Sequence, residues 1–172
     1  RTKNRRDYAM LPPSSVLTDW VKASGGKTYA IGKIGDIFSM RNIDSNVTGT
    51  DRDLMWQLQK HIEFAEDGSL IFANFVEFDS LFGHRRDPIG YAKALEWFDT
   101  GIADVVRNLL EDDLLIVTAD HGNDPTWSGT DHTREQVPVL LLGKTDFIQS
   151  GIELSDVATL ASKHLGVAIP DP

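Results

Sequence analysis

An apolar run at residues 114–117 is followed almost at once by an Asp-His pair, Asp120 and His121. A long loop rich in Gly, Asn, Asp and Ser comes next, and it contains a further histidine, His132. A continuous apolar run of this length is typical of a strand that is covered on both faces. The Asp-His pair therefore stands at the end of a buried strand, where polar side chains can reach a ligand.

The stretch at residues 74–78 repeats this pattern upstream. It is mostly apolar, it ends at Asp79, and His84 follows after a short loop. In parallel α/β sheets, ligands bind beyond the carboxyl ends of the strands. We therefore expect Asp79 and His84 to meet the later Asp and His side chains in a metal site built across the sheet.

Strand and helix patterns alternate along the chain. Strands are predicted at 28–31, 69–76, 114–118 and 137–142, with a short edge strand near Val47. Helices are predicted from Ser14 or Ser15 to Ala23, over 52–65, over 88–110, and from Ser155 or Asp156 to Leu165. This alternation indicates parallel βαβ units. The predicted fold class is α/β, with a mostly parallel sheet and helices on both faces.

Capping and turn residues place several of these boundaries. Thr50 or Asp51 is expected to cap the helix at 52–65, and Asp87 to cap the helix that Pro88 opens. Gly166 is expected to end the last helix, because glycine adopts left-handed backbone conformations readily. The apolar residues of helix 52–65 that are available to face the core are Leu54, Met55, Leu58, Ile62 and Phe64.

Length and charge narrow the class of protein. The chain has 172 residues, enough for one domain with its own core. A net charge of −9 argues against broad nucleic-acid binding, which needs a basic face. No apolar run approaches the ~20 residues that cross a bilayer, and no signal peptide pattern opens the chain, so we expect a cytoplasmic protein without membrane contact. The absence of cysteine leaves only nitrogen and oxygen ligands for a metal.

The candidate ligands are two carboxylates and three imidazoles: Asp79, His84, Asp120, His121 and His132. Mixed nitrogen and oxygen sets suit Mn, Zn or Fe(II). Five candidates exceed the three protein ligands of a single open catalytic zinc site, which favours two metals about 3.5–4 Å apart that clamp an in-line phosphoryl displacement. The alternative is a pair of ordinary turns with helix caps. Two such pairs at successive strand ends, together with His132, argue against that alternative.

Four further residues are candidates for supporting roles. Lys33 lies in a glycine-rich turn, where a bare backbone lets a ligand approach closely. It is either a phosphate contact or an exposed loop lysine, and its position alone does not choose between them. Asp124, Asp131 and Arg134 lie in the long loop and are candidate partners of the metal ligands or phosphate contacts.

Four stretches make the chain resemble the prokaryotic phosphopentomutases of the alkaline phosphatase superfamily. They are residues 31–37, 74–79, 83–91 and 118–135. An Asp-His-Gly core alone would indicate only the superfamily. The run Gly-Asn-Asp-Pro-Thr-Trp at 122–127, continued by Asp-His-Thr-Arg-Glu at 131–135, is what points to this family.

The resemblance implies a mutase that interconverts ribose 1-phosphate and ribose 5-phosphate, and the deoxyribose equivalents, in nucleoside catabolism. It implies two manganese ions and a phosphorylated threonine. Asp79, His84 and His132 would bind one ion, and Asp120 and His121 the other. Lys33 would lie near the transferred phosphate of the sugar-phosphate substrate.

One part of the family pattern has no match in this chain. In the family, the phosphorylated threonine and a further aspartate ligand come from a segment near the start of the protein, and Thr118 is not the equivalent of that threonine. We therefore expect a partial alkaline-phosphatase-like core: residues 1–13 as the trailing edge of the family's cap domain, and 14–172 as the carboxyl-terminal part of the core. Such a chain is expected to be inactive alone, with the missing amino-terminal half as its partner.

Two alternatives remain open at the level of sequence. One is another phosphotransferase of the superfamily, such as a cofactor-independent phosphoglycerate mutase or a phosphodiesterase. The other is a non-catalytic metal-binding fragment that completes another polypeptide, which predicts an unpaired strand edge.

Overall fold

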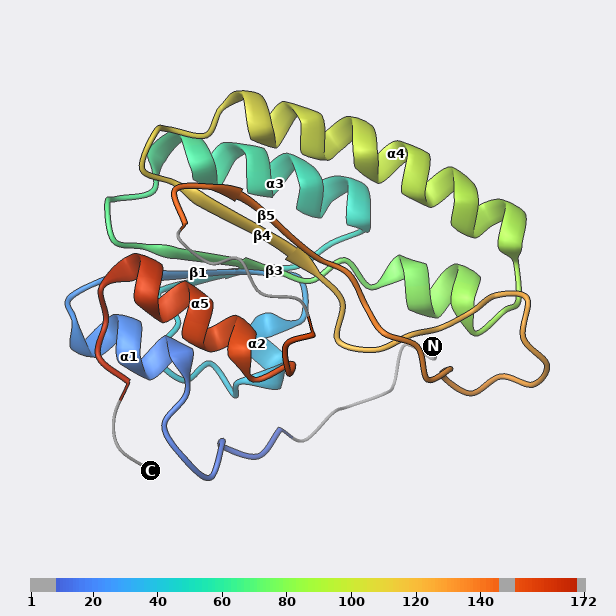
Figure 1. The fold of residues 1–172 in the computed structure, drawn as a ribbon, viewed down its shortest axis with the longest axis horizontal. Helices are drawn as coiled ribbons and strands as arrows, with labels where there is room; N and C mark the ends of the chain where they lie inside the picture. Colours follow the sequence, from blue (N-terminus) through green and yellow to red (C-terminus); the bar gives the residue numbers. More distant parts are fainter. Residues whose placement is uncertain (1–8, 146–150, 170–172) are drawn as a thin grey trace.

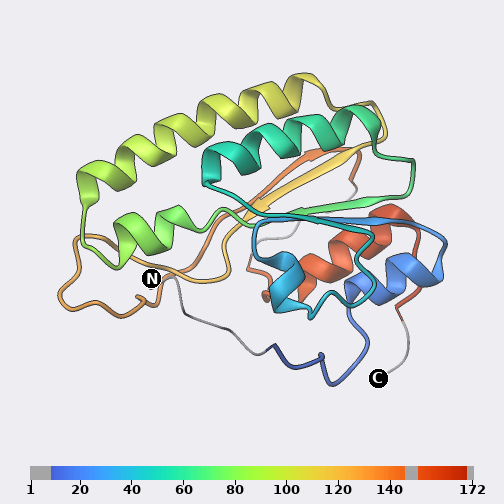
Figure 2. The ribbon, with the colours of Figure 1, turned by 180° about the vertical axis from the view of Figure 1, so that it is seen from behind.

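The computed structural model describes residues 9–145 and 151–169 and shows an α/β fold. Helices α3 (Asp51–Phe64) and α4 (Pro88–Arg107) cover one face of the strands. Helices α1 (Leu17–Ala23), α2 (Ile34–Ile37) and α5 (Asp156–Leu165) lie on the opposite face (Figures 1 and 2). The predicted arrangement of helices on both faces is confirmed. Residues 1–8, most of the segment predicted as a domain edge, lie outside the described residues.

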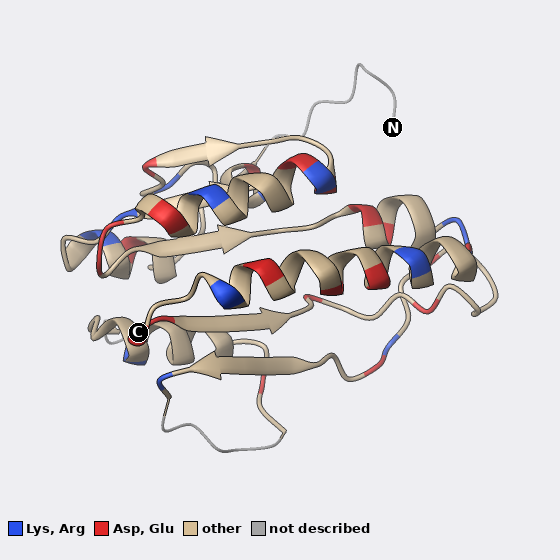
Figure 3. Ribbon diagram, turned by 90° about the horizontal axis from the view of Figure 1, so that it is seen from above, with Lys and Arg blue, Asp and Glu red and all other residues tan. Residues whose placement is uncertain are grey.

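The strands form two hydrogen-bonded groups. β2 (Ser45–Val47), β1 (Thr28–Ile31) and β3 (Leu70–Ala73) make a parallel sheet in that order. β4 (Leu114–Thr118) and β5 (Val139–Gly143) make an antiparallel pair. In Figure 3, β4 points the same way as the parallel strands and β5 points the opposite way. Four of these strands therefore run in one direction, as predicted, and β5 begins directly after Pro138, where proline costs no ladder hydrogen bond.

The core lies between the parallel sheet and the two covering helices. Its buried residues are Ile31, Leu54, Met55, Leu58 and Val105. The start of α3 is fixed as predicted, because the Thr50 hydroxyl accepts the Asp53 backbone N–H and the Asp53 carboxylate accepts the Thr50 N–H. Gly166 ends α5 with a left-handed φ of 65°. Phe64 was expected to face the core and is 58% exposed, so that prediction is wrong.

Two local predictions differ from the structure. α1 begins at Leu17 and not at a serine cap: the Ser15 hydroxyl accepts the Trp20 indole N–H, and the Asp19 carboxylate caps the helix by accepting the Val16 N–H. The strand predicted at 69–76 is shorter, because β3 ends at Ala73.

The loop expected around Asp79 is a π-helix, η1 (Phe78–Gly83). Phe78 packs edge-on against Tyr91 and Phe98 of α4, with ring centroids 5.7 Å away in both cases. These aromatic contacts are tertiary, which is why local sequence did not predict the element. Single π-helical turns occur often at functional sites. No helix within residues 9–145 or 151–169 combines the length and apolar character that crossing a membrane requires.

Candidate metal centre

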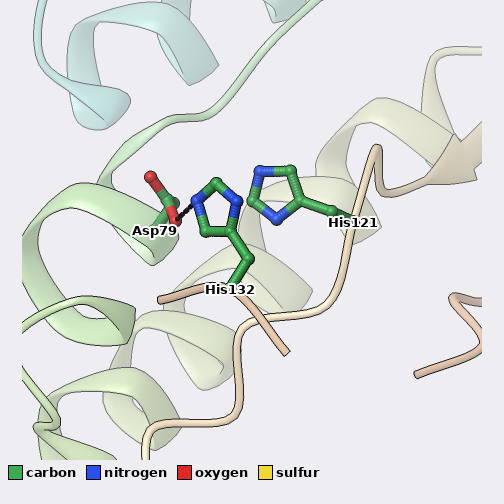
Figure 4. Close-up of side chains that lie close together, drawn as sticks. All are labelled: Asp79, His121 and His132. Carbon is green, nitrogen blue, oxygen red and sulfur yellow. Dashed lines mark ion pairs between the residues drawn. The ribbon is translucent and has the colours of Figure 1, made fainter. Parts of the chain in front are cut away.

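Asp79 is presented by the first turn of η1, close to three histidines. Figure 4 shows the imidazole of His132 lying between the Asp79 carboxylate and the ring of His121. Asp79 and His132 come from segments more than 50 residues apart. The structure therefore brings together the two regions whose side chains the sequence predicted to meet.

Three donor atoms form a nearly equilateral triangle. The Oδ1 atom of Asp79 lies 3.4 Å from His84 Nε2 and 3.3 Å from His132 Nε2. The two Nε2 atoms lie 3.2 Å apart. A tetrahedral ion with bonds of about 2.0–2.1 Å separates its ligands by about 3.4 Å. The triangle therefore has the size that one metal ion requires, and it leaves further coordination positions open.

The hydrogen bonds of two histidines set which ring nitrogen is available to a metal ion. The Nδ1 atom of His84 lies 2.6 Å from the Thr130 carbonyl oxygen, and Nδ1 of His121 lies 3.2 Å from the Gly122 carbonyl oxygen. A carbonyl only accepts, so each Nδ1 carries the proton and donates it. In a neutral imidazole this leaves the Nε2 lone pair available to a metal, as in many metal-binding histidines.

The long loop is closed on itself, and this closure brings its two histidines together. Gly122 and Thr133 form an isolated antiparallel bridge, and the Thr133 hydroxyl accepts the Asp124 N–H at 2.6 Å. The rings of His121 and His132 stack with centroids 3.7 Å apart and planes 18° from parallel. Lone pairs lie in the ring planes, so stacked rings do not converge on one point. His121 is therefore better placed for a neighbouring ion than for the ion of the triangle.

A second grouping includes His121. Asp79, His121 and His132 each place one possible ligand atom within 4.8 Å of the others. This set is looser than the triangle with His84, whose sides are 3.2–3.4 Å. We prefer the tighter set for a single ion, because its donor–donor distances match the separation of about 3.4 Å between ligands of one tetrahedral ion.

The remaining predicted site residues lie farther out. The Asp120 side chain is 73% exposed, and its Oδ2 is 3.7 Å from His121 Nε2. Asp120 therefore lies beside His121, at the exposed rim of the candidate metal centre. Lys33 precedes α2 and lines a cleft of about 460 Å³ beyond the carboxyl ends of β1 and β2. Glu77 and Ser80, which flank Asp79 in the chain, line the same cleft.

The cleft also contains a buried acid, Asp51, which is 4% exposed. Its carboxylate accepts the backbone N–H groups of Val76 (3.1 Å) and Glu77 (3.0 Å), which join β3 to η1. Burial raises the pKa of Asp51 to about 6, against the lowering effect of these two hydrogen bonds. Asp51 thus ties the start of α3 to the segment that leads to Asp79.

Sequence reasoning missed Asn123, which contacts a candidate ligand, and Arg86, which contacts Asn123. Asn123 is buried and donates from Nδ2 to Asp79 Oδ1 at 2.7 Å. Arg86 donates to Asn123 Oδ1 at 2.7 Å. Of the loop residues proposed instead, Asp124 accepts from Thr126 within its own turn, and Asp131 offers its backbone carbonyl to Arg86. The sequence feature that could have identified Asn123 is its position within the Gly-Asn-Asp motif.

The fold and the donor set define an α/β metal-binding protein. The chain belongs to the Metalloenzyme superfamily, which it matches over residues 1–169. It is 47% identical over 173 residues to the phosphopentomutase of Rhizobium meliloti (strain 1021), covering 98% of this chain and 43% of that protein. It is 51% identical over 144 residues to the phosphopentomutase of Shewanella woodyi, covering 83% of this chain and 36% of that protein.

The phosphopentomutase of Sinorhizobium fredii is 47% identical over 176 residues, an alignment that covers 100% of this chain and 43% of the relative. The chain thus spans about two fifths of the length of the curated relatives it matches.

Proposed function

We propose that this chain is the metal-binding part of a phosphopentomutase, which interconverts ribose 1-phosphate and ribose 5-phosphate and their deoxy equivalents. The observation that carries the proposal is the triangle of Asp79, His84 and His132, with sides of 3.2–3.4 Å. It occurs in a chain that is about half identical to proteins named phosphopentomutase. In this proposal, residues 14–172 are the carboxyl-terminal part of the core domain of a cytoplasmic enzyme.

The proposed ligands divide between two manganese ions. Asp79, His84 and His132 hold the first, and Asp120 and His121 supply ligands for the second. The stacked rings of His121 and His132 direct their in-plane lone pairs along separate planes, which supports two neighbouring ions over one shared ion. Bound there, the ions supply positive charge that stabilises the attacking and leaving oxygens of a transferring phosphoryl group.

The proposed substrate position is the cleft beside Lys33. Its volume of about 460 Å³ is adequate for a pentose phosphate. Its lining combines Lys33 with the hydroxyls of Thr48 and Ser80 and with carboxylates such as that of Glu77. An ammonium attracts a phosphate, and hydroxyl and carboxylate groups accept hydrogen bonds from sugar hydroxyls. Lys33 is therefore proposed to orient the phosphate, as a point charge.

The rest of the active site is proposed to come from the part of the relatives that this chain does not span. Among the described residues, β3 pairs only with β1, and β4 only with β5, so each strand keeps one edge without a partner. Such edges accept another strand readily. We propose that the missing amino-terminal half completes this region and brings the phosphorylated threonine, without which the chain turns over no substrate.

The test is a parallel assay of the polypeptide that contains this chain together with the segments the relatives add. It is given ribose 1-phosphate in one reaction, and 2- and 3-phosphoglycerate in others. Turnover of the pentose phosphate alone is expected, whereas turnover of the phosphoglycerates would favour the phosphoglycerate mutase alternative. The 172-residue chain serves as the control, and mutase activity in it would refute the assignment of the threonine to another segment.

A further inference from the structure

Arg86 adopts a backbone conformation that is unusual for its residue type. Its φ is 53°, in the left-handed region, which is uncommon for residues other than glycine. It lies in the turn that follows η1, and its guanidinium is within hydrogen-bonding distance of five acceptors: the carbonyls of Gly83 (3.2 Å), Asp124 (2.7 Å), Gly129 and Asp131 (2.6 Å), and Oδ1 of Asn123 (2.7 Å). A strained backbone that persists is held there by its surroundings, and here the surroundings are the loop of the metal centre.

One series of hydrogen bonds connects Arg86 to Asp79 through Asn123. Because Arg86 occupies Oδ1 of Asn123, the amide can only turn its Nδ2 group toward Asp79, and it donates to Oδ1 at 2.7 Å. That oxygen is the one that lies 3.3–3.4 Å from the two imidazoles. Asn123 is only 8% exposed. Gly83 leaves room for it, since a Cβ at that position would lie 2.5 Å from Asn123 Nδ2.

A second series of contacts connects Arg86 to His84 and His132. The carbonyls of Gly129 and Asp131, which it binds, flank Thr130. The Thr130 carbonyl accepts from His84 Nδ1 at 2.6 Å and so holds the ring with its Nε2 toward the site. His132 directly follows Asp131 in the chain. A single guanidinium thus supports the positions of all three donors.

We propose that Arg86 is the positioning residue of the Asp79–His84–His132 centre, acting through Asn123 and through the carbonyls of residues 129 and 131. The proposal rests on the proposed function only in that these three residues bind a metal ion. Arginine is required because its planar fork reaches separated acceptors at fixed angles, whereas a lysine ammonium is a single point with three donors. Asn123 and Arg86 touch no reacting atom in this scheme.

The test measures Mn²⁺ affinity of the 172-residue chain from the paramagnetic resonance of the free ion. Arg86→Lys and Asn123→Ala are each expected to weaken binding about 10–100-fold, as losses of ligand-orienting partners do. Arg85→Lys is the matched control, because Arg85 is the exposed neighbour, and it is expected to bind as the wild type does. Visible absorption of bound Co²⁺ is expected to change in both test variants, because a displaced Asp79 alters the coordination geometry.

A double variant distinguishes positioning from general support of the fold. If Arg86 acts on Asp79 through Asn123, the two losses share a route, and the double variant loses less than the product of the single losses. Thermal unfolding of the metal-free chains is measured alongside, and Asn123→Ser is a milder second substitution in case the alanine variant does not fold. Wild-type affinity and Co²⁺ spectra in Arg86→Lys and Asn123→Ala would overturn the proposal. The proposal would also be overturned if the affinity loss of the double variant equalled the product of the single losses and if these losses followed the thermal stability of the metal-free chains.

Failure of the wild-type chain itself to bind Mn²⁺ would be a different result. It would overturn the ligand assignment of the proposed function, and the role of Arg86 with it, whereas equal binding by all variants overturns the role of Arg86 alone.

Discussion

The Nε2 atoms of His84 and His132 lie 3.2 Å apart, although one histidine ends a π-helix and the other lies in a long loop. Since His84 donates its Nδ1 proton to the Thr130 carbonyl, its Nε2 faces His132 with a lone pair. Two imidazole nitrogens at this distance are bridged either by one proton or by a cation. The nearby Asp79 carboxylate oxygen favours a cation, because it adds a third donor and a negative charge.

The first prediction concerns removal of one corner of this triangle. His132→Ala is expected to weaken Mn²⁺ binding by at least about 100-fold, because losing a ligand should cost more than the 10–100-fold typical of its hydrogen-bonding partners. Isothermal titration of the chain with Mn²⁺ measures the change. His164→Ala is the matched control, since His164 lies on α5, where its Nδ1 contacts the Lys144 carbonyl. Equal affinity in the two variants would contradict the assignment.

The second prediction is that metal affinity falls in acid. Imidazoles bind metal ions only in the neutral form, so protons compete with the ion for each Nε2 atom. Mn²⁺ affinity is expected to be lower at about pH 5.5 than at about pH 7.5. Titrations at fixed ionic strength check this. A constant affinity over that range would mean that carboxylates alone hold the ion.

The sequence predicted which side chains come together at the site better than it predicted which residues hold them there. Asp79, His84, Asp120, His121 and His132 were expected to meet because strand ends and residue types carry a local signal, and the structure brings four of them into contact, with Asp120 at the rim. Arg86 was missed because four of its five acceptors are backbone carbonyls, which carry no signature in the sequence.

The same contrast appears in the fold. The caps at Thr50 and Gly166 were predicted correctly, since each depends on residues within a few positions. The π-helix around Asp79 was not predicted, because it depends on Phe78 meeting Tyr91 and Phe98 of a later helix. Local rules describe what a segment prefers, and these distant contacts decided what it adopted.

The third prediction tests the cap that starts α3. Thr50→Ala removes the hydroxyl that accepts the Asp53 N–H, and it is expected to lower the free energy of unfolding by about 1 kcal/mol. Urea denaturation measures the loss. Thr100→Ala is the control, because Thr100 lies inside α4 and donates its hydroxyl to the Glu96 carbonyl, so its loss is expected to be nearly neutral. A Thr50 variant as stable as the control would contradict a role for the capping box.

The last prediction follows from the buried carboxyl of Asp51. Burial raises its pKa from 3.8 to about 6 in the folded chain, so the folded state holds a proton more tightly than the unfolded state does. The stabilisation from that proton is complete below about pH 4, and it is lost as the pH rises through about 6. A shift of about two pH units corresponds to at most about 3 kcal/mol.

Asp51→Asn removes this titration and keeps an oxygen that can accept one of the two N–H groups of Val76 and Glu77. The variant is expected to be less stable than the wild type at pH 4, and the gap is expected to narrow as the pH rises to 7, because only the wild type then ionises a buried group. Urea denaturation at several pH values measures the gap. Asp44→Asn is the control, and its stability is expected to change with pH in the opposite direction. Hydrogen bonding to Lys22 lowers the pKa of Asp44, so the contribution of Asp44 to the free energy of unfolding is present at neutral pH and is lost in acid. A gap for Asp51→Asn that stays constant or widens toward pH 7 would show that Asp51 is already ionised in the folded chain at pH 4, and that its two hydrogen bonds outweigh its burial.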